Sequence, residues 1–304
     1  MDWSLLSRVA RSFAITIRWL PGEIRETVAL GYLLARASDS IADSSDAPRE
    51  LRLMALEGLR DGEVPADELG ELVAGQSVGA EAELLAALPD LVASMRASKD
   101  RERLEWVWRH ILRGQTFDLQ RFSDSSEPLS AEELGEYTYS VAGAVGEFWT
   151  ELSFDRVPRF SRSQRTEMVA LGARYGKGLQ LINILRDRAA DREIGRVYVA
   201  DDAVGRVLGE ATSGLVAGVE WASRVDRRRM SYACVLPARI GMEMIPELSA
   251  GSRERVKISK SRLRRVMWRE LRTIFESNGA GRAGALRGRT GPEAKTRGKT
   301  GRSS

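Results

Sequence analysis

The chain has 304 residues, with 47 lysines and arginines against 43 aspartates and glutamates, and 43% of its residues are hydrophobic. A single cysteine, Cys234, excludes an internal disulfide, and a single histidine, His110, argues against a histidine-rich zinc site or a Ser-His-Asp triad. No apolar run reaches the roughly 18 residues of a membrane span, so we expect a cytoplasmic protein whose chemistry depends on carboxylates, arginine and tyrosine.

Helical spacing of apolar residues recurs from the N-terminal part onward. In this half, helices are predicted at 22–40, 51–59, 80–98 and 102–112. A loop at 123–130 ends in Ser130, which forms a capping box with Glu133 and opens the next helix. Later helices are predicted at 134–154, 163–190, 204–225 and 231–245, and a last one opens near Ser259.

Strand-like alternation bounded by turns is absent from the sequence, and the prolines fall where helices should break, at Pro21, Pro128, Pro158 and Pro246. We therefore expect one all-α domain over residues 1–278. Residues 279–304 carry a net charge of +6, which leaves the rest of the chain at −2. This tail has almost nothing apolar to bury and is expected to be disordered and solubilising.

The tail offers two further interpretations. Its basic residues are candidates for weak, salt-sensitive contact with an anionic membrane surface, which would make the protein peripheral on the inner face of the membrane. We expect no nucleic-acid partner and a monomer. The tail also spells GxGxxG at 279–284, but no strand precedes it, so a dinucleotide-binding loop is rejected.

Two helix ends carry carboxylates four residues apart, Asp39 with Asp43 and Asp187 with Asp191. A spacing of four places both carboxylates on one helical face, about 6 Å apart along the axis. That arrangement suits Mg²⁺, which prefers one or two carboxylates together with phosphate oxygens. The alternative is a pair of unrelated solvated helix ends.

Each carboxylate pair continues a polar stripe along an otherwise apolar helix. The first stripe consists of Tyr32, Arg36, Asp39 and Asp43, and the second of Gln180, Asn183, Asp187 and Asp191, with Arg186 beside it. A polar stripe on a buried helix is costly unless it lines a wet, functional cavity. If the two helices face each other, four carboxylates meet, and metal ions are the natural compensation for their repulsion.

Several segments in register resemble the squalene/phytoene synthase family. They are RSF at 11–13, GYLLARASDSIAD at 31–43, YTYSVAGAVGEFW at 137–149 and GLQLINILRDRAADREIGRVYV at 178–199. The sequence VKISK at 256–260 is similar to a segment of the squalene synthases in that family. Among family members, the chain is most similar to the bacterial squalene synthases.

The resemblance implies an isoprenoid (terpenoid) synthase helical bundle with a central cavity. It also implies a prenyltransferase that condenses two farnesyl diphosphates head to head, through presqualene diphosphate, to squalene. Mg²⁺ would assist loss of diphosphate, and NADPH, bound at the same helical cavity, would supply the reduction.

The resemblance also implies roles for individual residues. Metal ligands would be Asp39, Asp43, Asp187 and Asp191. Residues that bind the diphosphates or lie beside them would be Arg11, Tyr32, Arg36, Gln180, Asn183, Arg186, Arg196 and Lys257. The prenyl cavity would be lined by Phe13, Val141, Ala142, Gly143 and Leu179. Ser140 stands where some squalene synthases carry a tyrosine, so the base would be Tyr32, Tyr137, Tyr139 or the released diphosphate. The catalytic candidates are Tyr32, Arg36, Tyr137 and Tyr139.

Two alternatives stay open. One is a carotenoid-type synthase that makes dehydrosqualene or phytoene without NADPH. The other is a non-catalytic relative that serves as an assembly or lipid-binding factor on the same fold. The intact aspartate pairs argue against the second alternative, because a binding protein has no need for four carboxylates in one cavity.

Overall fold

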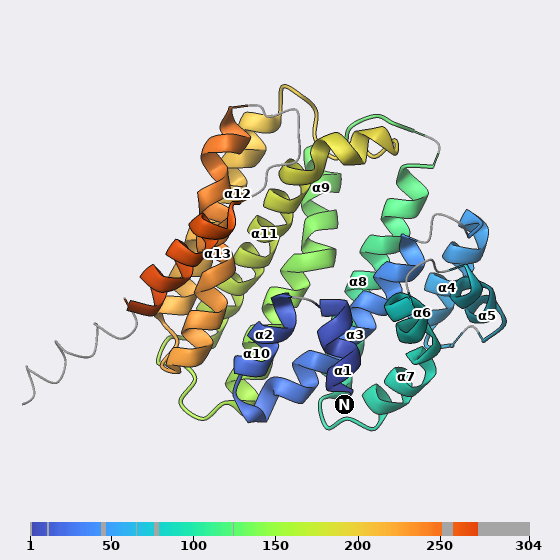
Figure 1. The fold of residues 1–304 in the computed structure, drawn as a ribbon, viewed down its shortest axis with the longest axis horizontal. Coiled ribbons are helices and arrows are strands. Elements are labelled where there is room, and N and C mark those ends of the chain that lie inside the picture. The colour runs from blue at the N-terminus through green and yellow to red at the C-terminus, as the bar shows by residue number, and fades with distance from the viewer. Residues whose placement is uncertain are drawn as a thin grey trace, which may run out of the picture.

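The chain is helical over almost all of its described length (Figure 1). The computed structural model describes residues 2–10, 12–43, 47–64, 66–75, 79–123, 125–250 and 258–272, with only the backbone described for 12–15. Within these ranges the strand-like pairing is a single isolated bridge between Ser161 and Val225. The all-α prediction is confirmed. The predicted boundary at 278 and the basic tail lie outside the described residues.

The N-terminal half contains eight described helices. They are α1 (Trp3–Ala10), α2 (Ser12–Trp19), α3 (Gly22–Ala42), α4 (Arg49–Asp61), α5 (Ala66–Ala74), α6 (Gly79–Ala86), α7 (Leu88–Arg96) and α8 (Arg101–Arg121). The single helix predicted at 80–98 was wrong, because Pro89 in the first turn of α7 lacks the N–H that a continuous helix would use. Helix α8 continues nine residues beyond the predicted end at 112.

The rest of the chain contains the longest described helix, α11. The described elements here are α9 (Ala131–Thr138), the π-helical turn η1 (Tyr139–Gly143), α10 (Ala144–Arg156), α11 (Arg165–Glu193), α12 (Val204–Ser223) and α13 (Arg228–Ser249), followed by a helix at 260–272. The capping box is confirmed, since the Ser130 hydroxyl accepts a hydrogen bond from the Glu133 N–H at 3.1 Å. The break predicted at Pro246 was wrong, because α13 continues for one more turn, in which Leu248 is buried.

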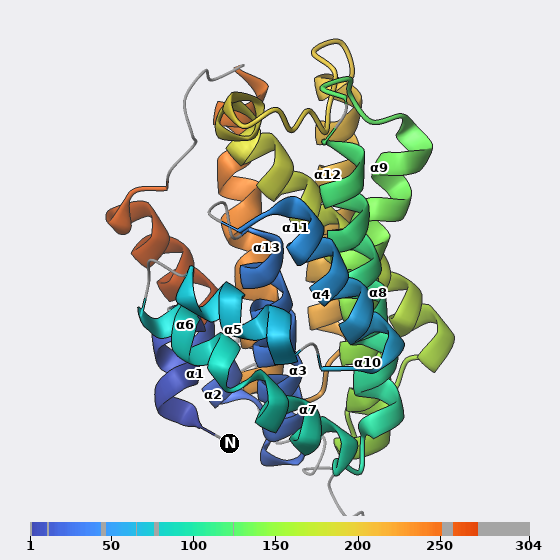
Figure 2. The same cartoon turned by 90° about the vertical axis from the view of Figure 1, so that its right-hand side faces the viewer.

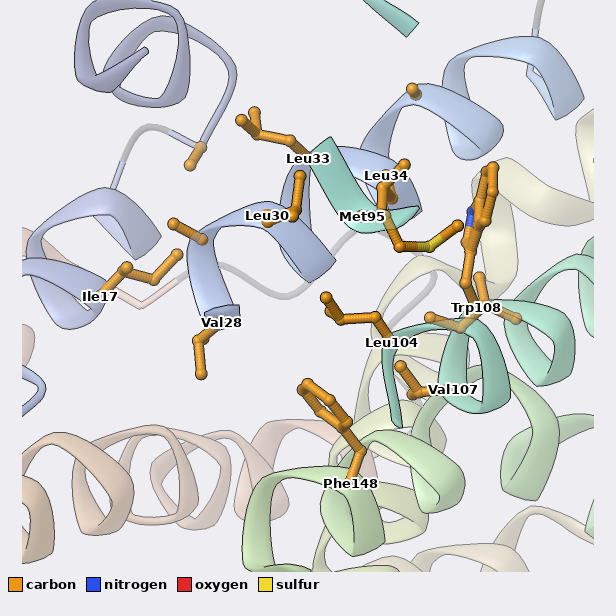
Figure 3. Packing of buried hydrophobic residues seen from close by; sticks show 14 of the residues in the cluster. Ile17, Val28, Leu30, Leu33, Leu34, Met95, Leu104, Val107, Trp108 and Phe148 are labelled. Atoms are coloured by element: carbon orange, nitrogen blue, oxygen red, sulfur yellow. The ribbon is translucent and has the colours of Figure 1, made fainter. Parts of the chain in front are cut away.

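Two groups of helices build the bundle. Helices α10, α11, α12 and α13 lie side by side, while α3 packs on α8 and α4 (Figures 1 and 2). In the core between these groups, Leu33 and Leu34 of α3 lie near Leu104 and Trp108 of α8, with Phe148 of α10 beneath them (Figure 3). Helix α3 is therefore an interior element. Helix α11 is also interior, because it packs on both α10 and α12. In the described ranges, no helix combines the length and the apolar character needed to span a membrane.

The backbones of η1 and α10 approach the backbone of α11 very closely. A Cβ atom on Gly146 would lie 1.9 Å from the carbonyl oxygen of Gly172, and a Cβ atom on Gly176 would lie 2.1 Å from that of Ala142. Both distances are far below van der Waals contact, so only glycine allows these helices to meet at this distance. The predicted single helix at 134–154 is interrupted at this contact by the π-helical turn.

Candidate active site

The C-terminal ends of α3 and α11 meet through one arginine. A tight turn follows α11, in which Gly195 adopts a left-handed φ of 81° and the Arg196 N–H donates to the Asp191 carbonyl at 2.8 Å. The turn directs the Arg196 side chain to α3, where its guanidinium lies 3.3 Å from an Asp43 carboxylate oxygen. The two aspartate pairs, separated by about 150 residues in sequence, therefore lie at one end of the bundle.

A fifth carboxylate, Asp118 of α8, belongs to the same cluster and was missed by the sequence analysis. Its carboxylate lies 3.3 Å from the Arg196 guanidinium and accepts a hydrogen bond from the Tyr198 hydroxyl at 2.5 Å. The Tyr198 ring in turn stacks on that of Tyr137, with centroids 5.2 Å apart. The available signal was a polar run, Gln115, Thr116 and Asp118, between the apolar residues Leu112 and Leu119.

The acidic cluster is electrostatically strained. Burial, together with the neighbouring Asp43, raises the pKa of Asp39 to about 6. Burial also raises the pKa of Asp191 to about 6, aided by Asp187. Burial likewise raises the pKa of Asp118. A bound cation would relieve this repulsion.

The donor set of this cluster fits Mg²⁺. Over the described part of the chain, no three acidic, histidine or cysteine side chains lie close enough to hold a metal without other ligands. Mg²⁺ commonly takes one or two carboxylates and completes its shell with water and phosphate oxygens. The oxygen-rich helix ends therefore suit a cation that arrives with a diphosphate.

Two further guanidinium groups are held at these ends. Arg36 pairs with Asp39 on its own helix and with Glu81 of α6, the latter at 2.5 Å. Glu81 was not predicted, because nothing in its local sequence links it to α3. On α11, Arg186 forms a two-point contact with the adjacent Asp187, one bond being 3.0 Å. Each arginine offers planar donors suited to diphosphate oxygens.

An apolar cavity of about 250 Å³ lies beside the charged end. Its walls come from α2, η1, α10, α11, α12 and α13, and they include the predicted Val141, Ala142 and Leu179. Burial raises the pKa of the lining Cys234 to about 12, so this thiol is neutral at physiological pH and is no nucleophile.

Helix α11 connects the cavity to the charged end. Gly176, Gln180 and Asn183 line the cavity, and Asp187 and Asp191 continue the same helical face. The rise of an α-helix places Asp191 about 12 Å beyond Asn183 along the axis. An elongated substrate with an apolar chain and a charged head therefore matches the two ends of this face.

The structure places the three predicted catalytic tyrosines in different surroundings. Tyr32 is half-buried on α3, where burial raises the pKa of its hydroxyl and Asp39 acts in the same direction. Tyr137 joins the Asp118 cluster, whereas Tyr139 lies against His110 and Glu147 and is not brought to the acidic helix ends.

The other predicted residues have different outcomes. Arg11, Lys257 and the side chain of Phe13 lie outside the described part of the chain. The predicted Gly143 packs against Tyr139 and Lys177.

Comparison with known proteins identifies the family of the chain. The family model described as squalene/phytoene synthase matches residues 6–203, which is more than half of the chain. The chain belongs to the squalene/phytoene synthase family. One relative within this family, the bifunctional lycopene cyclase/phytoene synthase of Leptosphaeria maculans, is 31% identical over 212 residues. That match covers 67% of this chain and 34% of the relative, so the chain spans about a third of that protein's length.

Solved structures similar to this squalene/phytoene synthase family member share its helical fold. TcSQS in complex with the ligand BPH1237 superposes with a TM-score of 0.70 at 20% identity, covering 88% of this chain and 84% of the other. Squalene synthase HpnC from Alicyclobacillus acidocaldarius superposes with a TM-score of 0.55 at 17% identity, covering 84% and 95%. The predicted isoprenoid-synthase bundle is confirmed.

Proposed function

We propose that this protein condenses two farnesyl diphosphates head to head, through presqualene diphosphate, and that the product is squalene. The observation that carries the proposal is the meeting of the α3 and α11 carboxylates around Arg196, at one end of an apolar cavity that follows the same face of α11. Family membership and the squalene synthase named among the structural neighbours support it.

The carboxylates at the two helix ends would hold the metal, through Asp39, Asp43, Asp187 and Asp191. Mg²⁺ bound there supplies positive charge that stabilises the departing diphosphate. The chain's own contribution is three arginines, Arg36, Arg186 and Arg196. Each is paired with a carboxylate in the substrate-free protein, and each would exchange that partner for diphosphate oxygens.

The cavity would hold the prenyl chains and exclude water from the carbocation formed when diphosphate leaves. Among the described residues, its lining contains no ionisable acid or base other than the neutral thiol of Cys234 and the phenol of Tyr175. Burial raises the pKa of the hydroxyls of Tyr32 and Tyr137, so both stay protonated at neutral pH. The released diphosphate is therefore the stronger candidate for the base that takes up the proton.

The reductive step would need a hydride donor, and the family resemblance makes that donor NADPH. Among the described residues, no arrangement identifies a nicotinamide site. The reduction to squalene depends on this donor, whereas the condensation that precedes it does not. The second candidate function is a carotenoid-type synthase without NADPH, and the phytoene synthase relative supports it.

The experiment incubates the purified chain with farnesyl diphosphate and Mg²⁺, with and without NADPH, and analyses the extracted lipids. Squalene that forms only with NADPH is the expected result, whereas dehydrosqualene or phytoene in both reactions would favour the second function. The variant Asp39→Asn should release little diphosphate. Asp201→Asn removes an exposed carboxylate and serves as the matched control. No diphosphate release from either the parent chain or the control would contradict any prenyltransferase activity.

A further inference from the structure

One face of the molecule, far from the acidic cluster, combines exposed tryptophans with arginines. We call it the Trp19 face; it consists of the end of α2, the start of α13 and the helix at 260–272, which lies against α13 at the left of Figure 1. The rings of Trp19 and Tyr232 are 5.6 Å apart, and the Tyr232 hydroxyl donates to the Met267 carbonyl at 3.1 Å. These contacts join the three elements into one surface.

Large apolar side chains on this face are open to solvent. Trp19 is 44% exposed, Trp268 is 65% exposed, and Met267 is also exposed. A groove of about 740 Å³ runs between the α2–α3 turn and the start of α13, and the side chains of Trp19 and Leu271 are part of its wall. Exposed apolar surface of this kind, next to charged side chains, is typical of an interaction site.

The charge of the Trp19 face is strongly positive. The groove contains four arginines and one glutamate: Arg25, Arg227, Arg228, Arg229 and Glu23. In the described part of the chain, Arg228 and Arg229 have no ion-pair partner, and neither do the exposed Arg264 and Arg265 of the neighbouring helix. The sequence after residue 272 adds more basic than acidic residues. The partner of this face is therefore anionic.

An anionic lipid surface fits both properties. Tryptophan is enriched at the level of lipid headgroups, and each arginine near an anionic leaflet adds electrostatic attraction. A nucleic-acid duplex would use the arginines but leave the tryptophans without a role, and a second copy of this chain would bring arginine against arginine. We propose that the Trp19 face docks onto an anionic lipid membrane.

The apolar cavity shares its helices with this face. Thr16 and Ala233 line the cavity, one helical turn from Trp19 and next to Tyr232, respectively. A membrane bound here would lie beside the wall of the cavity formed by α2 and α13. If the proposed function holds, an oily product would have a short path into lipid, but docking itself does not depend on catalysis.

The test measures cosedimentation of the full chain with phosphatidylcholine vesicles, and with the same vesicles containing phosphatidylglycerol, at low and at physiological salt. Binding is expected to anionic vesicles alone and to weaken with salt. The double variant Arg228→Glu, Arg229→Glu should lower the vesicle partition coefficient at least roughly tenfold. Trp268→Ala should lower it severalfold.

The matched control is the charge reversal Arg109→Glu, Arg113→Glu at two exposed positions of α8, a helix that lies away from α13 in Figure 1. This control should bind as the parent chain does, and circular dichroism should show that all variants fold. A variant that ends at Asn278 tests the basic tail. Unchanged binding of the Arg228/Arg229 variant, or complete loss in the shortened chain, would overturn the proposal. The proposal would also be overturned by DNA binding that competes with vesicle binding and is unchanged in the Trp268→Ala variant. Because no substrate is present, these outcomes are independent of the proposed reaction.

Discussion

Asp118 shows how a single buried carboxylate can position the charged groups of a site. It contacts the guanidinium of Arg196 and the hydroxyl of Tyr198, and Arg196 in turn reaches Asp43 on another helix. Asp118 is itself buried, so its partners lose both an ion pair and a hydrogen bond if the carboxylate is removed. Its role is that of a positioning residue.

We predict that Asp118→Ala lowers the free energy of unfolding by about 3 kcal/mol, because it leaves a largely buried guanidinium without one of its partners. Urea denaturation followed by circular dichroism measures the change. The control is Asp201→Ala, which removes a carboxylate that is 72% exposed and paired with Arg188 and Arg192. That change should cost less than about 1 kcal/mol. Equal costs for the two variants would contradict the role assigned to Asp118.

Asp191 illustrates a site residue that lowers stability. Its pKa of about 6 in the folded protein exceeds the value of about 3.9 for an unfolded aspartate. Between these values the folded state binds more protons than the unfolded state, so the contribution of Asp191 to stability falls as pH rises from about 4 to 6. Above pH 6, in the absence of metal, the full destabilisation is present.

We therefore predict that Asp191→Asn raises the melting temperature of the metal-free protein at pH 8, and that the gain disappears toward pH 4. Diphosphate release should fall by about 100-fold in the same variant, because a group that stabilises the leaving diphosphate is lost. Thermal melts in EDTA across this pH range check the first part. A melting temperature that is lower than the parent's at pH 8 would show that Asp191 is a structural carboxylate.

At the scale of elements, glycines set the distance between η1, α10 and α11. Gly172 and Gly176 occur four residues apart on the face of α11 that also lines the cavity. The same helical face therefore provides close backbone packing and, farther along, the carboxylates. The π-helical turn Tyr139–Gly143 takes part in this contact through Ala142, and it places Val141 and Ala142 on the cavity wall.

We predict that Gly176→Ala destabilises the fold by more than about 3 kcal/mol, since its Cβ would lie 2.1 Å from a backbone oxygen that cannot move independently. Gly209→Ala is the matched control on α12, where a Cβ would meet nothing within 4 Å. That change should stabilise the protein by about 0.5–1 kcal/mol, because alanine loses less conformational freedom in a helix. Chemical denaturation compares the two, and similar effects would contradict the close approach.

At the scale of the whole molecule, the site is complete only when α3, α8 and α11 are packed together. In the substrate-free protein, arginines neutralise only part of the carboxylate charge. The repulsion among the remaining negative charges is uncompensated. A ligand that brings both a cation and phosphate oxygens would satisfy the arginines and the carboxylates together. Such a ligand bridges helices from both halves of the chain.

We predict that Mg²⁺ and inorganic diphosphate together raise the melting temperature more than the sum of their separate effects. At a ligand concentration of 100 times Kd, the gain corresponds to about 2.7 kcal/mol. Asp39→Asn should abolish the synergy, whereas Asp201→Asn should retain it. Additive effects in the parent chain would mean that cation and anion bind at separate places.

The sequence by itself determined the features that depend on local spacing. The helical periodicity, the capping box at Ser130 and the polar stripes that end at Asp43 and Asp191 all follow from residues within a few turns of each other. Such features survive any correct arrangement of the helices. The spacing of the aspartates, together with these polar stripes, was therefore enough to predict which two helix ends form the candidate site.

Only the tertiary structure decided which helical faces meet. Asp118 and Glu81 reach the cluster from α8 and α6, contacts that no local pattern encodes. Tyr137 and Tyr139 are two residues apart but point in different directions. The packing of α9 and η1 brings Tyr137, and not Tyr139, to the Asp118 cluster. The folded chain also separates its charges, because the acidic cluster surrounds Arg196 whereas arginines that have no ion-pair partner among the described residues lie on the Trp19 face. Charge and hydrophobicity are properties of the sequence, but their juxtaposition is set by long-range packing.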